Sequence, residues 1–131
     1  MRFVFFVVGV MSLATTGVLF PVAKADCPLS FADDVPYGVG NAPYYAAAVD
    51  LDGDGDLDLA VANSGLLGGV GNVSVLLNNG EGTFAAHVLY GAGDTPVSVT
   101  AADLDGDGDL DLATANFYSD NVSILFNRRI E

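Results

Sequence analysis

The chain has 131 residues, a length that allows one small domain. Seventeen acidic residues against four basic ones give a formal net charge of −13 at pH 7. A field of that sign repels phosphate backbones and argues against nucleic acid as a partner. Ten of the seventeen carboxylates lie in two short runs, residues 50–58 and 103–111. Clustering of this kind indicates cation binding rather than a generally acidic surface.

The first 25 residues have the features of a secretory signal peptide. Arg2 supplies the positive charge, residues 3–20 are largely apolar, and Ala23-Lys24-Ala25 matches the small-x-small cleavage pattern. We expect cleavage after Ala25, which makes the protein secreted or cell-surface (periplasmic or extracellular), with no membrane association afterwards. The alternative is an uncleaved anchor, because the apolar run approaches the length that spans a bilayer. Pro21 and the cleavage site favour removal.

Comparison of the chain with itself shows that one unit is repeated. A shift of 53 residues (102 − 49) lays VDLDGDGDLDLAVAN, from Val49, onto ADLDGDGDLDLATAN, from Ala102. A shift of 49 (121 − 72) aligns NVSVLLN, from Asn72, with NVSILFN, from Asn121. The first shift also places Phe31, Val35, Tyr37, Gly38 and Gly40 on Phe84, Val88, Tyr90, Gly91 and Gly93. The two shifts differ by four residues, a difference that falls in the Gly-rich stretch of residues 64–71. An internal repeat of about fifty residues is the signature of a repeat architecture.

Within the unit, short β-type runs alternate with turn residues, and helical periodicity is absent outside the signal. We expect four strands, at residues 44–49, 57–62, 73–77 and 83–90, with a hairpin turn at residues 79–82. A fourth-strand equivalent at residues 31–37 precedes them, and a third-strand equivalent lies at residues 122–127. Four antiparallel strands in about fifty residues are typical of a propeller blade. The expected division is therefore 26–43 (fourth-strand equivalent and linker), 44–95 (repeat 1) and 96–131 (repeat 2, without its own fourth strand).

Each acidic run has the spacing of a cation-binding loop. Counted from the first Asp, carboxylates fall at positions 1, 3, 5, 7 and 9, with glycine (Gly55 or Gly108) at position 6. This alternation matches the start of an EF-hand loop, in which side chains at 1, 3 and 5 and the carbonyl at 7 bind Ca²⁺. Glycine at position 6 permits the sharp turn. The candidate metal ligands are Asp50, Asp52, Asp54, Asp56 and Asp58 in the first loop and Asp103, Asp105, Asp107, Asp109 and Asp111 in the second.

Donor chemistry selects the ion. Ligation by oxygen alone, without His or Cys, favours Ca²⁺, Mg²⁺ or Mn²⁺ over zinc or copper. A flexible loop with many oxygens suits Ca²⁺ better than Mg²⁺, which demands tight octahedral geometry. We therefore expect two Ca²⁺ ions, one in each loop. An acidic solvated turn is the alternative for a single loop, but two nearly identical copies at the same place in a repeat argue against it.

The run DLDGDGDLDLAVAN, followed by NVSVLLNNGEGTF, resembles an FG-GAP/VCBS-type repeat of the kind found in integrin α-subunit propellers. The resemblance implies all-β, antiparallel four-stranded propeller blades, with Ca²⁺ held in the loop that joins the first two strands of a blade. The family's FG and GAP signatures are poorly preserved, and the nearest match is Tyr90-Gly91-Ala92-Gly93. Position 12 of the loops is Val61 or Thr114, so the bidentate Glu of an EF-hand is missing.

No catalytic constellation emerges from the sequence, and we expect that the protein is not an enzyme. His87 is the sole histidine, and every clustered Asp belongs to a cation loop. The expected function is a calcium-binding surface module for adhesion or for protein or glycan interaction. The alternatives are an accessory domain of a secreted enzyme and a truncated fragment of a larger propeller. Two blades cannot close a ring, so either a homo-oligomer completes one or the sequence is a fragment, which we favour.

Overall fold

The structure, a computed structural model, describes residues 29–66 and 69–128. The predicted signal peptide, residues 1–25, lies outside the described residues. The chain divides into a short unit, Met1–Asp34, and a larger one, Val35–Glu131, to which every observed strand belongs. Among the described residues, no helix has the length and apolar character needed to cross a membrane.

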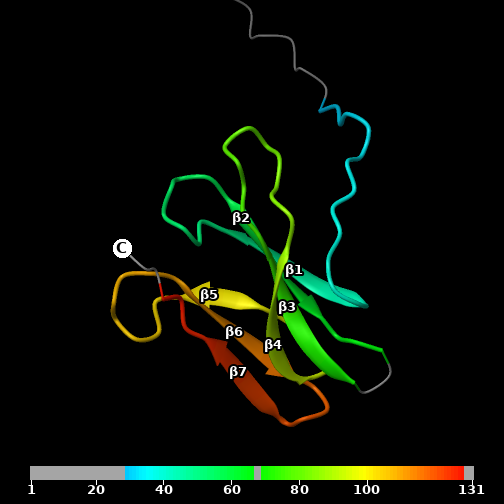
Figure 1. Cartoon of the computed structure of the whole chain (residues 1–131), viewed down its shortest axis with the longest axis vertical. Coiled ribbons are helices and arrows are strands. Elements are labelled where there is room, and N and C mark those ends of the chain that lie inside the picture. Colours follow the sequence, from blue (N-terminus) through cyan, green and yellow to red (C-terminus); the bar gives the residue numbers. More distant parts are fainter. Residues whose placement is uncertain (1–28, 67–68, 129–131) are drawn as a thin grey trace, which may run out of the picture. The chain divides into compact units, whose positions relative to one another are not determined.

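The larger unit consists of two antiparallel sheets (Figure 1). The all-β, antiparallel prediction is confirmed, and the described residues contain no helix. The first sheet has four strands in the order of the chain: β1 (Pro43–Val49), β2 (Asp58–Asn63), β3 (Val70–Leu76) and β4 (Val88–Asp94). The second has three: β5 (Thr100–Ala102), β6 (Asp111–Asn116) and β7 (Asn121–Leu125).

The fourth strand lies further along the chain than the sequence predicts. The hairpin turn after β3 forms, since the Asn79 amide donates to the Thr83 carbonyl at 2.8 Å and Asn78 pairs with Phe84. Val75 pairs with Val88, and Asn78 pairs with Phe84. Asn78 lies three residues after Val75, whereas Phe84 lies four residues before Val88. The additional residue makes a β-bulge that interrupts the ladder. A continuous strand therefore begins only at Val88 and includes residues 91–94, which lie beyond the predicted end of the strand at residue 90.

The predicted strand at residues 31–37 is also wrong, because this segment forms no strand. A strand needs a hydrogen-bonding neighbour, and β3 is that neighbour for the repeat-equivalent segment β4. Among the described residues, no strand lies beside residues 31–37 in the way that β3 lies beside β4. Tyr37 nevertheless contacts Phe84 edge to face, with ring centroids 5.3 Å apart. The remaining strands deviate less from their predicted bounds, with β3 beginning three residues early.

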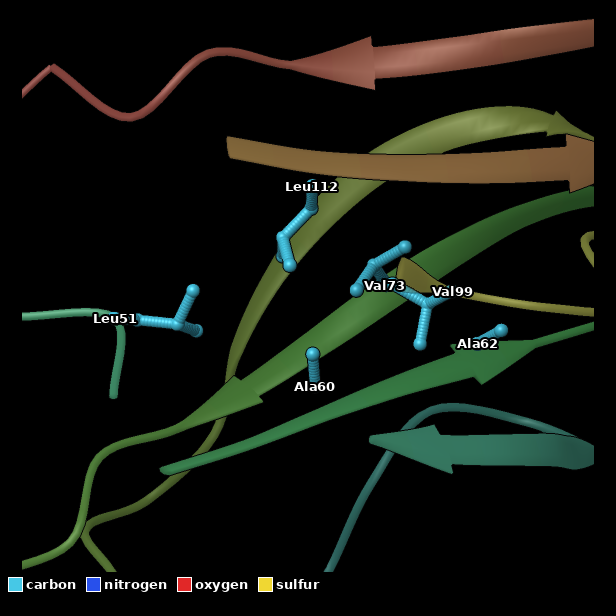
Figure 2. Close-up of a cluster of buried hydrophobic side chains, with 6 residues drawn as sticks. All are labelled: Leu51, Ala60, Ala62, Val73, Val99 and Leu112. Carbon is cyan, nitrogen blue, oxygen red and sulfur yellow. The ribbon is translucent and has the colours of Figure 1, made fainter. Parts of the chain in front are cut away.

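The hydrophobic core of the larger unit is formed by both sheets (Figure 2). The first sheet and its loop contribute Leu51, Ala60, Ala62 and Val73, and the second sheet and the residue before it contribute Leu112 and Val99. Ala60, Ala62 and Val73 are completely buried. Because alanine side chains are short, they let the backbones of the two sheets approach closely while the Val and Leu side chains fill the space between them.

Candidate metal centre

The two acidic runs form equivalent loops, one between β1 and β2 and the other between β5 and β6. The backbone at Gly55 has φ of 97° and that at Gly108 has φ of 95°. These values lie in the left-handed region of the backbone, which residues other than glycine rarely adopt. Glycine at loop position 6 therefore makes the sharp turn that the sequence predicts.

The first carboxylate of each loop organises the turn around itself. The Asp50 side chain accepts hydrogen bonds from the amides of Gly53, at 2.7 Å, and Gly55, at 3.0 Å. Asp103 accepts the same pair in the second loop, from Gly106 at 2.7 Å and Gly108 at 3.1 Å. The two loops thus have the same internal hydrogen bonds, as their sequence identity leads one to expect.

Three carboxylates of each loop converge. One oxygen from each of Asp50, Asp52 and Asp58 lies within 4.8 Å of the other two, and the same holds for Asp103, Asp105 and Asp111. Calcium–oxygen bonds are about 2.3–2.6 Å long, so ligands on opposite sides of one ion lie about 5 Å apart. Each triad therefore fits a single Ca²⁺ ion by spacing and by donor chemistry.

The other predicted ligands lie outside the two convergent triads. These are Asp54, Asp56, Asp107 and Asp109. The carboxylate of Asp54 accepts the amide of Asp56 at 2.9 Å, and that of Asp107 accepts the amide of Asp109 at the same distance. These carboxylates therefore stabilise the turn next to the triad.

The last carboxylate of each triad also has a structural role that the sequence did not reveal. Asp58 is completely buried, and its two oxygens accept the amides of Leu51 and Asn78, both at 2.8 Å. Asp111 is equally buried and accepts the amides of Leu104, at 2.9 Å, and Asn127, at 2.8 Å. Charged acceptors make stronger hydrogen bonds than neutral ones. Each of these residues therefore fastens its loop to the segment that follows the third strand of the same sheet.

Two asparagines were missed by the sequence reasoning. The side-chain amide of Asn127 donates to the carbonyl of Leu51 at 2.8 Å and to that of Leu110 at 3.3 Å. Asn78, its repeat equivalent, donates to the carbonyl of Leu57 at 3.1 Å. Both residues close the aligned segments NVSVLLN and NVSILFN. A polar residue that recurs at the end of a mainly hydrophobic β-type run indicates a structural role, and this was the signal that could have revealed both asparagines.

The electrostatics of the triads favour a bound cation. Desolvation raises the pKa of Asp52 above its ordinary value, and the neighbouring carboxylates of Asp54, Asp58 and Asp50 raise it further, against a lowering by the Asp54 amide. The pKa of Asp105 is raised by the same causes in the second loop. In each loop, desolvation and, after it, the neighbouring negative charges disfavour ionisation of the central carboxylate, and a divalent cation would offset the repulsion between these charges.

An open groove of about 490 Å³ adjoins the first loop. Its walls are mainly apolar and include Val75, Val88, Tyr90 and Leu112, from strands of both sheets. Asp52 of the first triad also lines it. The groove therefore brings an apolar surface next to one of the candidate metal centres.

Comparison with known proteins gives one match. Residues 50–114 match the model of the FG-GAP-like repeat family, and this segment contains the acidic loops of both sheets. No curated protein and no solved structure matches the chain.

Proposed function

We propose that this protein is a secreted, calcium-binding module of FG-GAP-type repeats with β-propeller blades, on the basis of the family match over residues 50–114. Its role is adhesion at a surface or recognition of a protein or glycan, and it has no catalytic chemistry of its own. The observation that carries the proposal is the pair of carboxylate triads, which have the same composition and the same spacing in both loops.

In this proposal Asp50, Asp52 and Asp58 hold one Ca²⁺ ion. Asp103, Asp105 and Asp111 hold the other. When bound, the ion neutralises three carboxylates that otherwise repel one another. The residues around it orient the ligands: the glycine turn directs Asp50, and the amides of Leu51 and Asn78 fix Asp58. Asp54, Asp107 and the carbonyls of Asp56 and Asp109 are the proposed additional ligands.

The groove beside Asp52 supports a role in recognition. Apolar side chains provide contact area for a ligand, and the first metal centre provides a site of fixed charge at the edge of that area. Sites that combine an apolar surface with a few placed polar groups are typical of ligand binding. We further propose that residues 1–25 direct export, which exposes the loops to the millimolar Ca²⁺ for which extracellular modules are suited.

Isothermal titration calorimetry on the exported protein tests the metal sites. We expect two Ca²⁺ ions per chain, with dissociation constants of roughly 10⁻⁴ to 10⁻³ M. The double variant Asp52→Asn/Asp105→Asn removes one charged ligand from each triad and should weaken binding at least about tenfold, which corresponds to about 1.4 kcal/mol per site.

A matched control removes the same charge elsewhere. Asp33 and Asp34 are exposed and belong to neither loop, so Asp33→Asn/Asp34→Asn should leave Ca²⁺ binding unchanged. The absence of binding heat in the wild type, or an equal loss of affinity in both double variants, would contradict the proposed sites.

A further inference from the structure

The contact between the two sheets buries different residues from each of them. The first sheet contributes Ala60, Ala62 and Val73, none of which is exposed. The second contributes Val99, which is 3% exposed, Leu112, which is 6% exposed, and the partly buried Ala101. Because the sheets are copies of one unit, each also carries the equivalents of the residues that its neighbour contributes.

Four of those six equivalents are exposed to solvent, and the other two, Leu59 and Ala113, are half-buried. The second sheet has a set that we call the trailing face, and the first sheet has a set that we call the leading face. Val122, in the trailing face, is 60% exposed, whereas its counterpart Val73 is completely buried. Ala46 and Ala48, in the leading face, are exposed as well. The trailing face consists of Ala113, Ala115 and Val122, the equivalents of Ala60, Ala62 and Val73; the leading face consists of Ala46, Ala48 and Leu59, the equivalents of Val99, Ala101 and Leu112.

The hydrogen bond between the two sheets also has an equivalent donor and an equivalent acceptor that do not meet within the described part of one chain. Asn127 of the second sheet donates to the Leu51 carbonyl of the first loop. The corresponding donor, Asn78, reaches only a carbonyl of its own sheet among the described residues, and the corresponding acceptor is the Leu104 carbonyl. A trailing face and a leading face brought together would therefore also place a donor beside an acceptor.

The segment before β1 is already placed for such an arrangement. At the end of β4, the Gly93 amide donates to the Ser123 hydroxyl of the second sheet at 3.2 Å. At the equivalent position, the Gly40 amide donates to the Ser74 hydroxyl of the first sheet at 3.0 Å. Gly40 thus contacts the first sheet as Gly93 contacts the second. Within the described residues β7 pairs with β6 alone, so the edge of β7 that corresponds to the β4 side of β3 is unpaired.

We propose that this protein associates head to tail with a second copy of itself, the trailing face of one copy packing on the leading face of the next. Residues 35–41 of the second copy then add a fourth strand to β7. The register of β3 with β4 pairs Val73 with Tyr90 and Val75 with Val88, so Val122 pairs with Tyr37 and Ile124 with Val35. Addition of a strand to an open sheet edge is a common mode of association.

The sequence of the added strand suits an outermost position. Pro36 takes the place of Leu89, which is 50% exposed in β4, and proline is tolerated in edge strands because its missing N–H group faces solvent there. The association buries apolar groups that the isolated chain exposes, which supplies the driving force. It is heterologous, because two different faces meet, and it repeats until the copies close a ring or form a chain. The inference does not depend on the metal sites.

Sedimentation velocity on the full chain, expressed with its own N-terminal segment, tests this inference. The wild type should form oligomers whose size increases with concentration. Val122→Asp places a charge in the trailing face and Ala46→Asp places one in the leading face, so each variant alone should be monomeric. The control Leu66→Asp changes a side chain that is 73% exposed and belongs to neither face. It should associate like the wild type.

Mixing the two monomeric variants distinguishes a head-to-tail contact from a symmetric one. Val122→Asp retains an intact leading face and Ala46→Asp an intact trailing face, so an equimolar mixture should form a dimer with one copy of each and nothing larger. If Val122→Asp does not unfold cooperatively, Ala115→Asp replaces it in the same face. A wild type that stays monomeric at every concentration, variants that still form oligomers, or a mixture of folded variants that stays monomeric would each overturn the inference.

Discussion

The side-chain amide of Asn127 donates a hydrogen bond of 2.8 Å to the carbonyl oxygen of Leu51, a residue 76 positions earlier in the chain. Leu51 lies between two carboxylate residues of the first triad, Asp50 and Asp52, and its own amide donates to Asp58. The backbone amide of Asn127 donates to Asp111 of the second triad. One asparagine therefore connects both candidate metal centres.

We expect Asn127→Ala to destabilise the protein more than Asn78→Ala. The first substitution removes the bond between the sheets and leaves the Leu51 carbonyl without this donor, at a cost of about 1–2 kcal/mol. The second removes two solvent-exposed hydrogen bonds, one of 3.1 Å to the Leu57 carbonyl and one of 3.0 Å from the Gly80 amide, for which a smaller cost is expected. Urea unfolding of both variants provides the free energies, and equal losses would show that Asn127 does not connect the sheets energetically.

Asp58→Asn should destabilise the protein even in the absence of Ca²⁺. Both oxygens of Asp58 accept backbone amides in a buried position, and an asparagine must turn an NH₂ group toward one of these donors. The expected loss is about 1.5–3 kcal/mol. Asp52→Asn is the matched substitution within the same triad. Among the described residues, the Asp52 carboxylate accepts the Asp54 amide alone, at 3.2 Å.

Chemical denaturation in the presence of a chelator separates the two roles of the triad. Asp52→Asn should unfold there like the wild type, or at slightly higher denaturant, because it removes a like charge. If Asp58→Asn also unfolds like the wild type without Ca²⁺, its hydrogen bonds contribute nothing and Asp58 acts only as a ligand.

Gly55→Ala should destabilise the first loop. The backbone there has φ of 97°, and a left-handed conformation costs a residue with a Cβ about 1–2 kcal/mol. Gly91→Ala is the control, because an added Cβ there meets nothing within 4 Å and no left-handed backbone is required. Thermal unfolding should show a lower midpoint for Gly55→Ala alone, and a lower midpoint in Gly91→Ala of the same size would contradict the conformational explanation.

The repeat made much of this architecture predictable. Identical acidic runs, glycine at position 6 and alternating β-type segments predicted two loops, their turn and an antiparallel sheet, because these features depend on local backbone preferences and side-chain periodicity. The bulge before β4 was not predictable in this way. It adjusts the register of Val88 against Val75, and register depends on packing between strands rather than on the residues of one strand.

Long-range contacts were hidden for the same reason. Asp58 has the spacing of a metal ligand, but its burial and its bond to the Asn78 amide, 20 residues away, follow from the sheet that brings them together. Asn127 carries no motif that links it to Leu51. The repeat aligns residues 31–37 with residues 84–90, yet the segment forms no strand, since strand formation also requires a neighbour.

Thermal unfolding with Ca²⁺ and with a chelator tests the central claim, that the two acidic loops are calcium sites that stabilise the fold. Each ion that binds only the folded loop adds about 2.7 kcal/mol at a Ca²⁺ concentration 100 times the dissociation constant. The account predicts a clearly higher midpoint in Ca²⁺ for the wild type and a much smaller shift for Asp52→Asn/Asp105→Asn. A midpoint that is the same in Ca²⁺ and in chelator would contradict it.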